Sequence, residues 1–418
     1  MNENFEIKEC RSCGSKELIP IISLGNQYIV NFVKFRDEKS SKCPLELVLC
    51  GNCKLLQLKH NAPAESMWGN QYWYRSGINK MIKDDLLDIV NNIKNLLTFK
   101  EGDVILDIGC NDGTMLGFYN LPEVNLVGFE PSRNVAQEAA SKGFNVINDF
   151  FNAKKFKERF GEKKAKVITA ISMFYDLEDP NQFLEDIISI LDPNGILVIQ
   201  QNYLVTMLQN NAFDNICHEH REYYSYYSLK NLLDKYNLKT FDVSLNEING
   251  GSIRTYIKRN ESNLTTPEGA EERLAKIIEN ESNLSLDTKK PYLEFASRID
   301  SIKKELLDFL KREKAFGKKI CALGASTRGL VLLQYFGLDS SLIDCIFDKN
   351  PDKEGKIAVG SWIPITSPSN IDKYKPNYQL VLIWHIFQGI GEDEKEFIKK
   401  GGKFILPLNR LKIIDQIN

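Results

Sequence analysis

This chain of 418 residues has few histidines, few tryptophans and almost no net charge. It has 4 histidines and 4 tryptophans, and its 54 basic and 56 acidic residues give a net charge of −2. Such a balance gives no electrostatic footprint for general nucleic-acid binding. No apolar run reaches the roughly 18 residues of a membrane-spanning helix. The first six residues lack the basic and apolar regions of a secretory signal, so we expect none.

The chain does have enough apolar residues for packed cores. Hydrophobic residues make up 43% and charged residues 26%, which is typical of a folded soluble protein. At roughly 100–200 residues per domain, the length predicts two or three domains. We therefore expect a cytoplasmic protein rather than a membrane protein, a disordered protein or a secreted disulfide scaffold. It should bind neither nucleic acid nor membranes, and the working hypothesis for its assembly is a monomer.

Four of the nine cysteines form two Cys-x-x-Cys pairs, Cys10 with Cys13 and Cys50 with Cys53. Two such pairs complete a tetrahedral set of sulfur ligands for zinc. A redox dithiol is the alternative, but it would open a helix after a strand, and one pair would suffice. Four thiolates leave no open position for a catalytic water, so the predicted zinc is structural. The isolated cysteines, which we expect to be buried, are Cys43, Cys110, Cys217, Cys321 and Cys345.

The order of expected strands and helices predicts an α/β protein with three parts. Residues 1–68 hold the cysteine pairs and short β-like runs, whereas residues 69–260 alternate strands with helices. Such alternation indicates βαβ units and a parallel sheet. Residues 261–418 begin with a polar helical connector and then alternate again. The expected strands of the middle part are residues 104–107, 125–129, 144–147, 165–170 and 195–200.

The strongest chemical signal follows the first of these strands. Asp107 ends the strand, and Gly109 and Gly113 lie in a loop of small residues before a helix, where the backbone can approach a ligand closely. Glu130 ends the second strand, where a carboxylate can accept both hydroxyls of a ribose. This pattern resembles class I methyltransferases that use S-adenosylmethionine; a dehydrogenase-type fold with a degenerate glycine turn is the alternative. The candidate cofactor residues are Asp107, Gly109, Asn111, Asp112, Gly113, Glu130, Pro131, Asp149, Phe150 and Phe174.

A second group of candidate residues surrounds two of the four histidines. His218 and His220 flank Glu219, and a histidine oriented by a carboxylate makes a plausible general base. A metal site would need a third ligand, and the spacing is not that of a zinc protease helix. The alternative is a core histidine that is hydrogen-bonded to the backbone. His60 and His385 have no comparable neighbours in the sequence, and we expect them to be structural.

Taken in order, several short motifs resemble those of the sugar C-methyltransferases, which act on nucleotide-linked ketodeoxysugars. The resemblance covers nearly the whole chain. It implies a class I methyltransferase Rossmann-like central domain, a small N-terminal zinc-binding domain and a second Rossmann-like C-terminal domain, with the substrate between the last two. The motifs are Cys10-x-x-Cys13, Asn31-Phe32, Cys50-x-x-Cys53, Tyr74-Arg-Ser-Gly77, Asp107-x-Gly109, His218-Glu219-His220, Asn249-Gly250-Gly251-Ser252-Ile253-Arg254, Gly324-Ala-Ser-Thr-Arg-Gly329 and Asp348-Lys-Asn-Pro351.

The resemblance also implies a reaction, in which a base removes a proton beside a ketone and the resulting enolate takes the methyl group. His220 is the implied base, Glu219 would bind or orient the sugar, and Tyr74 or Asn202 could stabilise the enolate. Aromatic packing under the zinc domain is the alternative role for Tyr74. The candidate catalytic residues are His220, Glu219, Tyr74 and His218. The candidate substrate residues are Asn202, Asp176, Cys217, Arg254 and Arg328.

Two positions depart from this family pattern. Many relatives carry a tyrosine where Cys217 stands and a histidine near Asp176, which we expect to be ionised. Arg328, at a predicted helix start, could pair with the diphosphate of the nucleotide sugar; a vestigial Rossmann domain that only frames the cleft is the alternative.

Two other functions remain open at the level of sequence. One is an O- or N-methyltransferase, which needs no enolisable proton. The other is a zinc-ribbon RNA-binding or assembly protein with a dead methyltransferase fold. The near-neutral charge and the intact Asp107, Gly109 and Glu130 argue against this last hypothesis.

Overall fold

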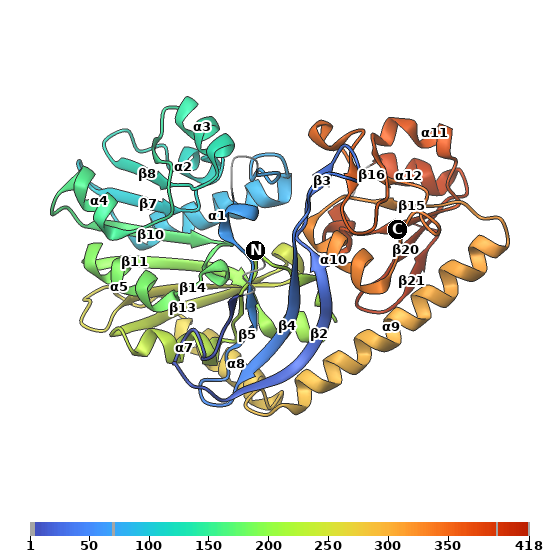
Figure 1. The fold of residues 1–418 in the computed structure, drawn as a ribbon. Coiled ribbons are helices and arrows are strands. Elements are labelled where there is room, and N and C mark those ends of the chain that lie inside the picture. Colours follow the sequence, from blue (N-terminus) through green and yellow to red (C-terminus); the bar gives the residue numbers. More distant parts are fainter. Residues whose placement is uncertain (1–4, 69–71, 390–391, 417–418) are drawn as a thin grey trace.

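The computed structural model describes residues 5–68, 72–389 and 392–416. Two α/β units lie side by side, and two long strands from the N-terminal region run between them (Figure 1). The predicted α/β class is therefore confirmed. The predicted boundary after residue 68 adjoins residues 69–71, which lie outside the described residues, and the division into 1–68, 69–260 and 261–418 stays a prediction.

The N-terminal region forms an antiparallel sheet in the order β12-β5-β4-β2. Three of its strands come from the first 58 residues, but β12 comes from the middle of the sequence and pairs with β5 through Glu222↔Gln57 and Tyr223↔Leu56. A separate two-stranded ladder joins β3 to β17 of the C-terminal part. The N-terminal region is thus bonded to both α/β units. The strands are β1 (Phe5–Glu6), β2 (Leu18–Tyr28), β3 (Phe32–Val33), β4 (Lys42–Cys50), β5 (Leu56–Leu58), β6 (His60–Asn61) and β12 (Glu222–Tyr223).

The central unit holds a seven-stranded sheet in the order β13-β14-β11-β10-β7-β8-β9. The ladders from β9 through β11 are parallel, and β14 is antiparallel to both of its neighbours. The predicted strands of this part all form, within a few residues of the predicted ends. They are β7 (Val104–Ile108), β8 (Asn125–Phe129), β9 (Asn145–Ile147), β10 (Ala165–Ile171), β11 (Leu191–Asn202), β13 (Leu238–Asn246) and β14 (Ser252–Arg259).

Helices cover both faces of this sheet because its strands are apolar on both sides. Successive side chains of a strand point to opposite faces. Leu106 of β7 packs in the cluster with Phe156, Leu184 and Leu229 from one set of helices, and Ile105 packs with Ile89 and other residues from the opposite set. The helices of the central unit are α1 (Lys80–Leu96), α2 (Thr114–Tyr119), α3 (Arg133–Ser141), α4 (Ala153–Phe160), α5 (Pro180–Ile190), α6 (Leu204–Gln209) and α7 (Tyr226–Asp234).

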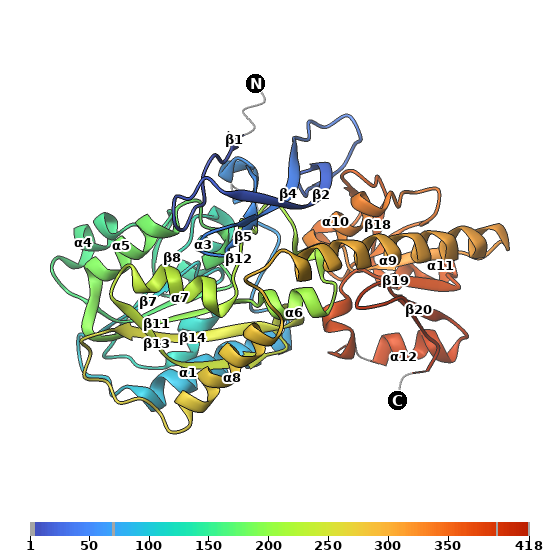
Figure 2. The ribbon, with the colours of Figure 1, turned by 90° about the horizontal axis from the view of Figure 1, so that it is seen from below.

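The C-terminal part begins with the predicted helical connector, α8 (Ala270–Asn283) and α9 (Lys290–Ala315), and the long α9 lies along the second α/β unit (Figure 2). The sheet of that unit has the order β18-β16-β15-β19-β20-β21, and all its ladders except β20–β21 are parallel. Its strands are β15 (Ile320–Leu323), β16 (Ile346–Phe347), β17 (Ile357–Ala358, paired with β3), β18 (Ile365–Thr366), β19 (Tyr378–Val381), β20 (Lys403–Leu406) and β21 (Lys412–Ile414). Its helices are α10 (Thr327–Phe336), α11 (Ile371–Tyr374) and α12 (Glu392–Lys399).

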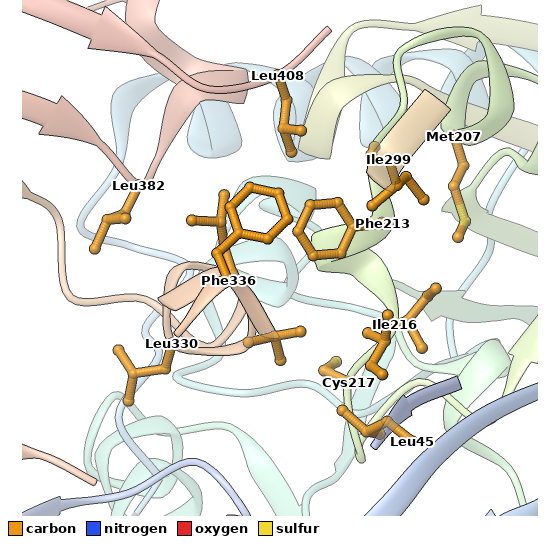
Figure 3. Close-up of a cluster of buried hydrophobic side chains, with 14 of the residues drawn as sticks. Leu45, Met207, Phe213, Ile216, Cys217, Ile299, Leu330, Phe336, Leu382 and Leu408 are labelled. Carbon is orange, nitrogen blue, oxygen red and sulfur yellow. The ribbon is translucent and has the colours of Figure 1, made fainter. Parts of the chain in front are cut away.

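The two α/β units share one hydrophobic core at their contact (Figure 3). Phe213, from the turn after α6, stacks on Phe336 of α10 with ring centroids 4.9 Å apart. Leu45 of β4 and Ile299 of α9 belong to the same cluster. Because interiors are close-packed, this shared core fixes the position of one unit against the other. None of the described helices is long and apolar enough to span a bilayer.

Candidate active site

A cavity of about 690 Å³ lies at the carboxyl edge of the central sheet. Its walls come from the ends of β7, β8, β10 and β11, from residues 72–86, and from residues 326–328 and 383–386 of the C-terminal part. Ligands of open α/β sheets bind at this edge. The predicted site residues that line the cavity are Tyr74, Asp107, Gly109, Asn111, Glu130, Pro131, Asp149, Phe150, Asp176, Asn202, Glu219, His220 and Arg328.

The loop after β7 is shaped to bring backbone against a ligand. Gly109 has a φ of +74°, and a Cβ at this position would lie 3.2 Å from Met173 Cγ, so glycine is favoured by both conformation and space. The N–H groups of Asn111 and Ser132 donate to the two carboxylate oxygens of Glu130 at 3.0 and 2.8 Å. They fix the Glu130 carboxylate at the cavity wall and leave lone pairs for ribose hydroxyls.

The Tyr74–Gly77 motif is fastened to this loop. Asn111 Oδ1 accepts from the Ser76 N–H at 3.0 Å, and Asn111 Nδ2 donates to the Tyr74 carbonyl at 3.3 Å. Asp112 Oδ2 accepts from the Gly77 N–H at 3.1 Å. We predicted Asp112 as a cofactor residue, but it does not line the cavity. It instead holds the segment that carries Tyr74.

Two further predicted cofactor residues lie around the base of the loop. Asp107 is buried and accepts from Thr169 Oγ1 at 2.7 Å; burial raises the pKa of Asp107 to about 7, although the Thr169 bond opposes the rise. Gly113 precedes α2 with a φ of +75°, and a Cβ there would lie 2.8 Å from Phe144. Gly113 does not line the cavity; it lets the helix start close to its neighbours.

His220 has a fixed tautomer. Its Nδ1 lies 2.9 Å from the Asn215 carbonyl oxygen. Because a carbonyl only accepts, Nδ1 carries the proton and Nε2 of the neutral ring carries the lone pair. Burial lowers the pKa of His220 to about 4, so the ring is neutral near pH 7. A neutral, oriented imidazole at a cavity wall is what a general base requires.

Two carboxyl groups line the cavity near this ring. Burial raises the pKa of Glu219 to about 7. Burial also raises the pKa of Asp176 well above its ordinary range, and the Glu219 charge adds to the rise. This shift opposes the expectation of an ionised Asp176. The nearby Arg221 donates from Nη1 to the backbone carbonyl of Asp176 at 3.1 Å and not to its carboxylate.

Three predicted site residues lie behind the cavity wall. His218 is buried, and its Nε2 lies 2.9 Å from the Cys43 carbonyl oxygen. It is therefore a core histidine that is hydrogen-bonded to the backbone, which was the alternative to a catalytic role. Cys217 is fully buried, with its Sγ within 4.8 Å of a Glu219 oxygen and a His220 nitrogen. Phe174 packs against other aromatic rings under the site. None of the three lines the cavity.

Arg254 also lies outside the cavity, because acidic partners engage its side chain. Its guanidinium forms ion pairs with Asp85 at 2.8 Å and Asp88 at 2.7 Å, and its Nε donates to Gln200 Oε1 at 2.8 Å. Asp85 and Gln200 themselves line the cavity. We predicted that Arg254 contacts the substrate directly. It instead bonds to two residues of the cavity wall, Asp85 and Gln200.

Arg328 lines the cavity but is already paired. It forms a bidentate ion pair with the fully buried Asp214, at 2.8 and 3.1 Å, and its Nη1 donates to the Asn249 carbonyl at 2.6 Å. Trp384 Nε1 donates to the same carboxylate at 2.9 Å. Asp214 and Asn249 belong to the central unit, whereas Arg328 and Trp384 belong to the C-terminal one. These bonds therefore join the two units at the wall of the cavity.

Sequence reasoning missed several residues of the wall. His385, which we expected to be structural, lines the cavity near Gly250. Tyr72 also lines the cavity. Tyr72 lies two residues before the Tyr74–Gly77 motif, whereas His385 had no local signal. Other missed wall residues are Asp85, Tyr175, Gln200 and Asn249.

The four paired cysteines converge at one point in the N-terminal region. All four Sγ atoms lie within 4.8 Å of one another, with Cys10–Cys53 and Cys13–Cys50 separations of 3.5 Å. A tetrahedral zinc with Zn–S bonds of about 2.3 Å requires sulfurs roughly 3.8 Å apart. Gln57 Nε2 also donates to Cys10 Sγ at 3.1 Å, as outer groups do toward metal-bound thiolates. The predicted structural zinc site is confirmed by this cluster.

The sheet order, the glycine loop after β7 and the carboxylate after β8 define a methyltransferase of class I, which uses S-adenosylmethionine. Three family models match the chain: a zinc binding domain at residues 10–68, a methyltransferase domain at 81–243 and a C-methyltransferase C-terminal domain at 247–409. The C-methyltransferase NovU of Streptomyces niveus is 29% identical over 418 residues, covering 98% of this chain and 97% of the relative. The chain is an S-adenosylmethionine-dependent methyltransferase that is similar to the C-methyltransferases along nearly its whole length.

Solved structures resemble the central unit. The plantazolicin methyltransferase BpumL in complex with SAH has a TM-score of 0.33 and 16% identity, and the match covers 42% of this chain and 82% of that one. The magnesium protoporphyrin IX methyltransferase of Synechocystis PCC 6803 with bound SAM has a TM-score of 0.32 and 12% identity, covering 43% and 78%.

Proposed function

We propose that the protein transfers the methyl group of S-adenosylmethionine to a carbon beside the ketone of a nucleotide-linked 4-ketodeoxysugar, as in the synthesis of branched deoxysugars. The supporting observation is the neutral His220, which shares one cavity with the cofactor loop. Carbon becomes nucleophilic only after a base removes a proton beside a carbonyl. Oxygen or nitrogen acceptors would need no enolisable proton on the substrate.

The two ends of the cavity take different parts of the reaction. At one end, Glu130 accepts the ribose hydroxyls, and Gly109, Asn111 and Pro131 receive the rest of the cofactor, with Asp149 and Phe150 beside the adenine. When bound, S-adenosylmethionine supplies an electrophilic methyl group. At the other end, His220 Nε2 takes the proton, and Glu219 and Asn202 bind the sugar. Asn202 is placed for this by its bond from Nδ2 to Asn215 Oδ1 at 3.1 Å.

A panel of nucleotide-linked 4-keto-6-deoxysugars in heavy water tests this function. Without S-adenosylmethionine, the enzyme should catalyse uptake of one deuterium beside the ketone of its substrate. With the cofactor, the product should gain one methyl group and lose one carbon-bound hydrogen, as measured by mass spectrometry. Methyl gain with every carbon-bound hydrogen retained would show an oxygen or nitrogen acceptor instead.

Glu130→Gln should weaken binding of S-adenosylhomocysteine by about 10- to 100-fold. The amide loses the negative charge and turns an NH2 group toward the N–H of Asn111 or Ser132, which leaves a donor unpaired. Isothermal titration calorimetry measures the change. Glu158→Gln, on the exposed face of α4, is the matched control and should bind like the wild type. Equal affinity in the Glu130 variant would remove this residue from the cofactor site.

A further inference from the structure

The enolate in the proposed reaction needs a hydrogen-bond donor at its oxygen. Removal of the proton by His220 places negative charge on the former ketone oxygen, and a preorganised donor lowers the barrier for this step. Asn202 Nδ2 already donates to Asn215, and the Arg328 guanidinium is held by Asp214. Asp176 is a further candidate for this role.

Asp176 has the geometry of such a donor. It ends the short helical turn η2 (Phe174–Asp176) after β10 and lines the cavity together with Glu219 and His220. Its Oδ1 is buried and has no hydrogen-bond partner among the residues that the structure describes. A buried carboxyl oxygen without a partner is costly, and protonation of the carboxyl lowers that cost.

The surroundings favour the neutral acid over the carboxylate. Burial is the main cause that raises the pKa of Asp176, and the carboxyls of Glu219 and Glu222 raise it further; only Arg221 opposes them. A carboxylic acid that stays neutral in an apolar site donates a strong hydrogen bond to an enolate oxygen. The titratable and charged groups around Asp176 are Glu219, Glu222, Arg221, Tyr72, Tyr175, Tyr223 and Cys217.

We propose that Asp176 acts as a neutral carboxylic acid that donates a hydrogen bond to the ketone oxygen of the substrate as the enolate forms. The C–H bond breaks, its proton goes to His220 Nε2, and its electron pair forms the C=C bond while the oxygen becomes negative. That oxygen takes the hydrogen bond from Asp176. The enolate carbon would then bond to the methyl group as the bond from that methyl to the sulfonium sulfur breaks, with the electron pair of the broken bond staying on the sulfur of S-adenosylhomocysteine. The C=O bond re-forms, the Asp176 proton stays on its carboxyl, and His220 releases its proton to water. This inference rests on the proposed function.

Deuterium exchange into the ketosugar, measured without S-adenosylmethionine, tests the role of Asp176 separately from methyl transfer. Asp176→Ala removes the donor and should slow exchange by about 10²–10³-fold. Asp176→Asn is nearly isosteric, keeps a weaker donor and should slow it less, by roughly tenfold. Both variants should bind S-adenosylhomocysteine with wild-type affinity, which shows that the cofactor end is intact.

The pH profile of exchange distinguishes an acid from a structural side chain. Wild-type exchange should fall at high pH as Asp176 loses its proton, and this alkaline limb should vanish in Asp176→Asn. Glu219→Gln is the matched control, because it removes the neighbouring carboxyl. The alkaline limb should remain in this variant, since it reflects the loss of the Asp176 proton. A limb that persists in Asp176→Asn, or an Asp176→Ala variant that exchanges at the wild-type rate, would overturn the proposal. Absence of exchange in the wild type across the sugar panel would instead overturn the proposed function.

Discussion

Replacing His220 by asparagine should slow both deuterium exchange and methyl transfer by about a thousandfold. A general base contributes about 10²–10⁴-fold to a rate, and the amide can keep the bond to the Asn215 carbonyl while lacking a basic nitrogen. Binding of S-adenosylhomocysteine should be unchanged, because the cofactor loop lies at the other end of the cavity. Exchange kinetics and calorimetry on the same preparation measure the two quantities.

The acid side of the wild-type pH profile belongs to the same prediction. The pKa of His220 is lowered to about 4, so the basic form persists above that pH and is lost only as the pH falls through about 4. The acid limb of exchange should therefore lie near pH 4 and not near 6.5, where an exposed histidine titrates. His60→Asn, which changes a histidine that does not line the cavity, is the control and should keep the wild-type rate. Full activity in the His220 variant would assign proton removal to another group.

Loss of the zinc site should destabilise the whole chain. Cys13→Ser should lower the zinc content from about one ion per chain and reduce the melting temperature by about 10 °C or more, since the free energy of metal binding is coupled to folding. Cys13 is the suitable position, because it is only partly buried and its replacement costs little packing. Elemental analysis and calorimetry measure the two effects. Cys43→Ser, at a cysteine outside the cluster, should keep the zinc.

The same variant should lose activity as well. Cys53 is followed by β5, and β5 pairs with β12, which begins two residues after His220. The Leu58 N–H donates to the Arg221 carbonyl at 2.8 Å, and the Arg221 N–H donates to the Tyr175 carbonyl at 2.9 Å. A loosened β5 would therefore displace the chain that carries Glu219 and His220. A zinc-depleted protein with normal exchange rates would show that the metal supports only its own domain.

The sequence predicted the central sheet well, because its strands are buried, apolar and separated by helices of ordinary length. The cofactor loop and Glu130 were found for the same reason, since they follow directly after such strands. The partners of Arg254 and Arg328 could not be found in this way. Asp85 and Asp214 are more than 100 residues away from them, and only the folded chain shows that these cations are already paired.

Protonation was equally hidden from the sequence. In the sequence, Asp176 cannot be distinguished from an ordinary acidic residue. Only the folded structure shows that burial and the neighbouring Glu219 raise its pKa and so favour its neutral form. His218 and His220 look equivalent in their motif, yet one contacts a backbone carbonyl in the core and the other lines the cavity. A strand or loop of two or three residues is too short for periodicity to assign which side chain faces inward.

The strand pairings of the N-terminal region set an order for folding during synthesis. This region leaves the ribosome before the two α/β units, but its sheet lacks β12 until residue 223 has been made, and β3 lacks its partner β17 until residue 358. Domains generally fold as units while the chain elongates. Here the N-terminal region waits for strands that are made much later, so its β5 edge stays unpaired until residue 223 and its β3 edge until residue 358, and both are open to wrong partners in the meantime.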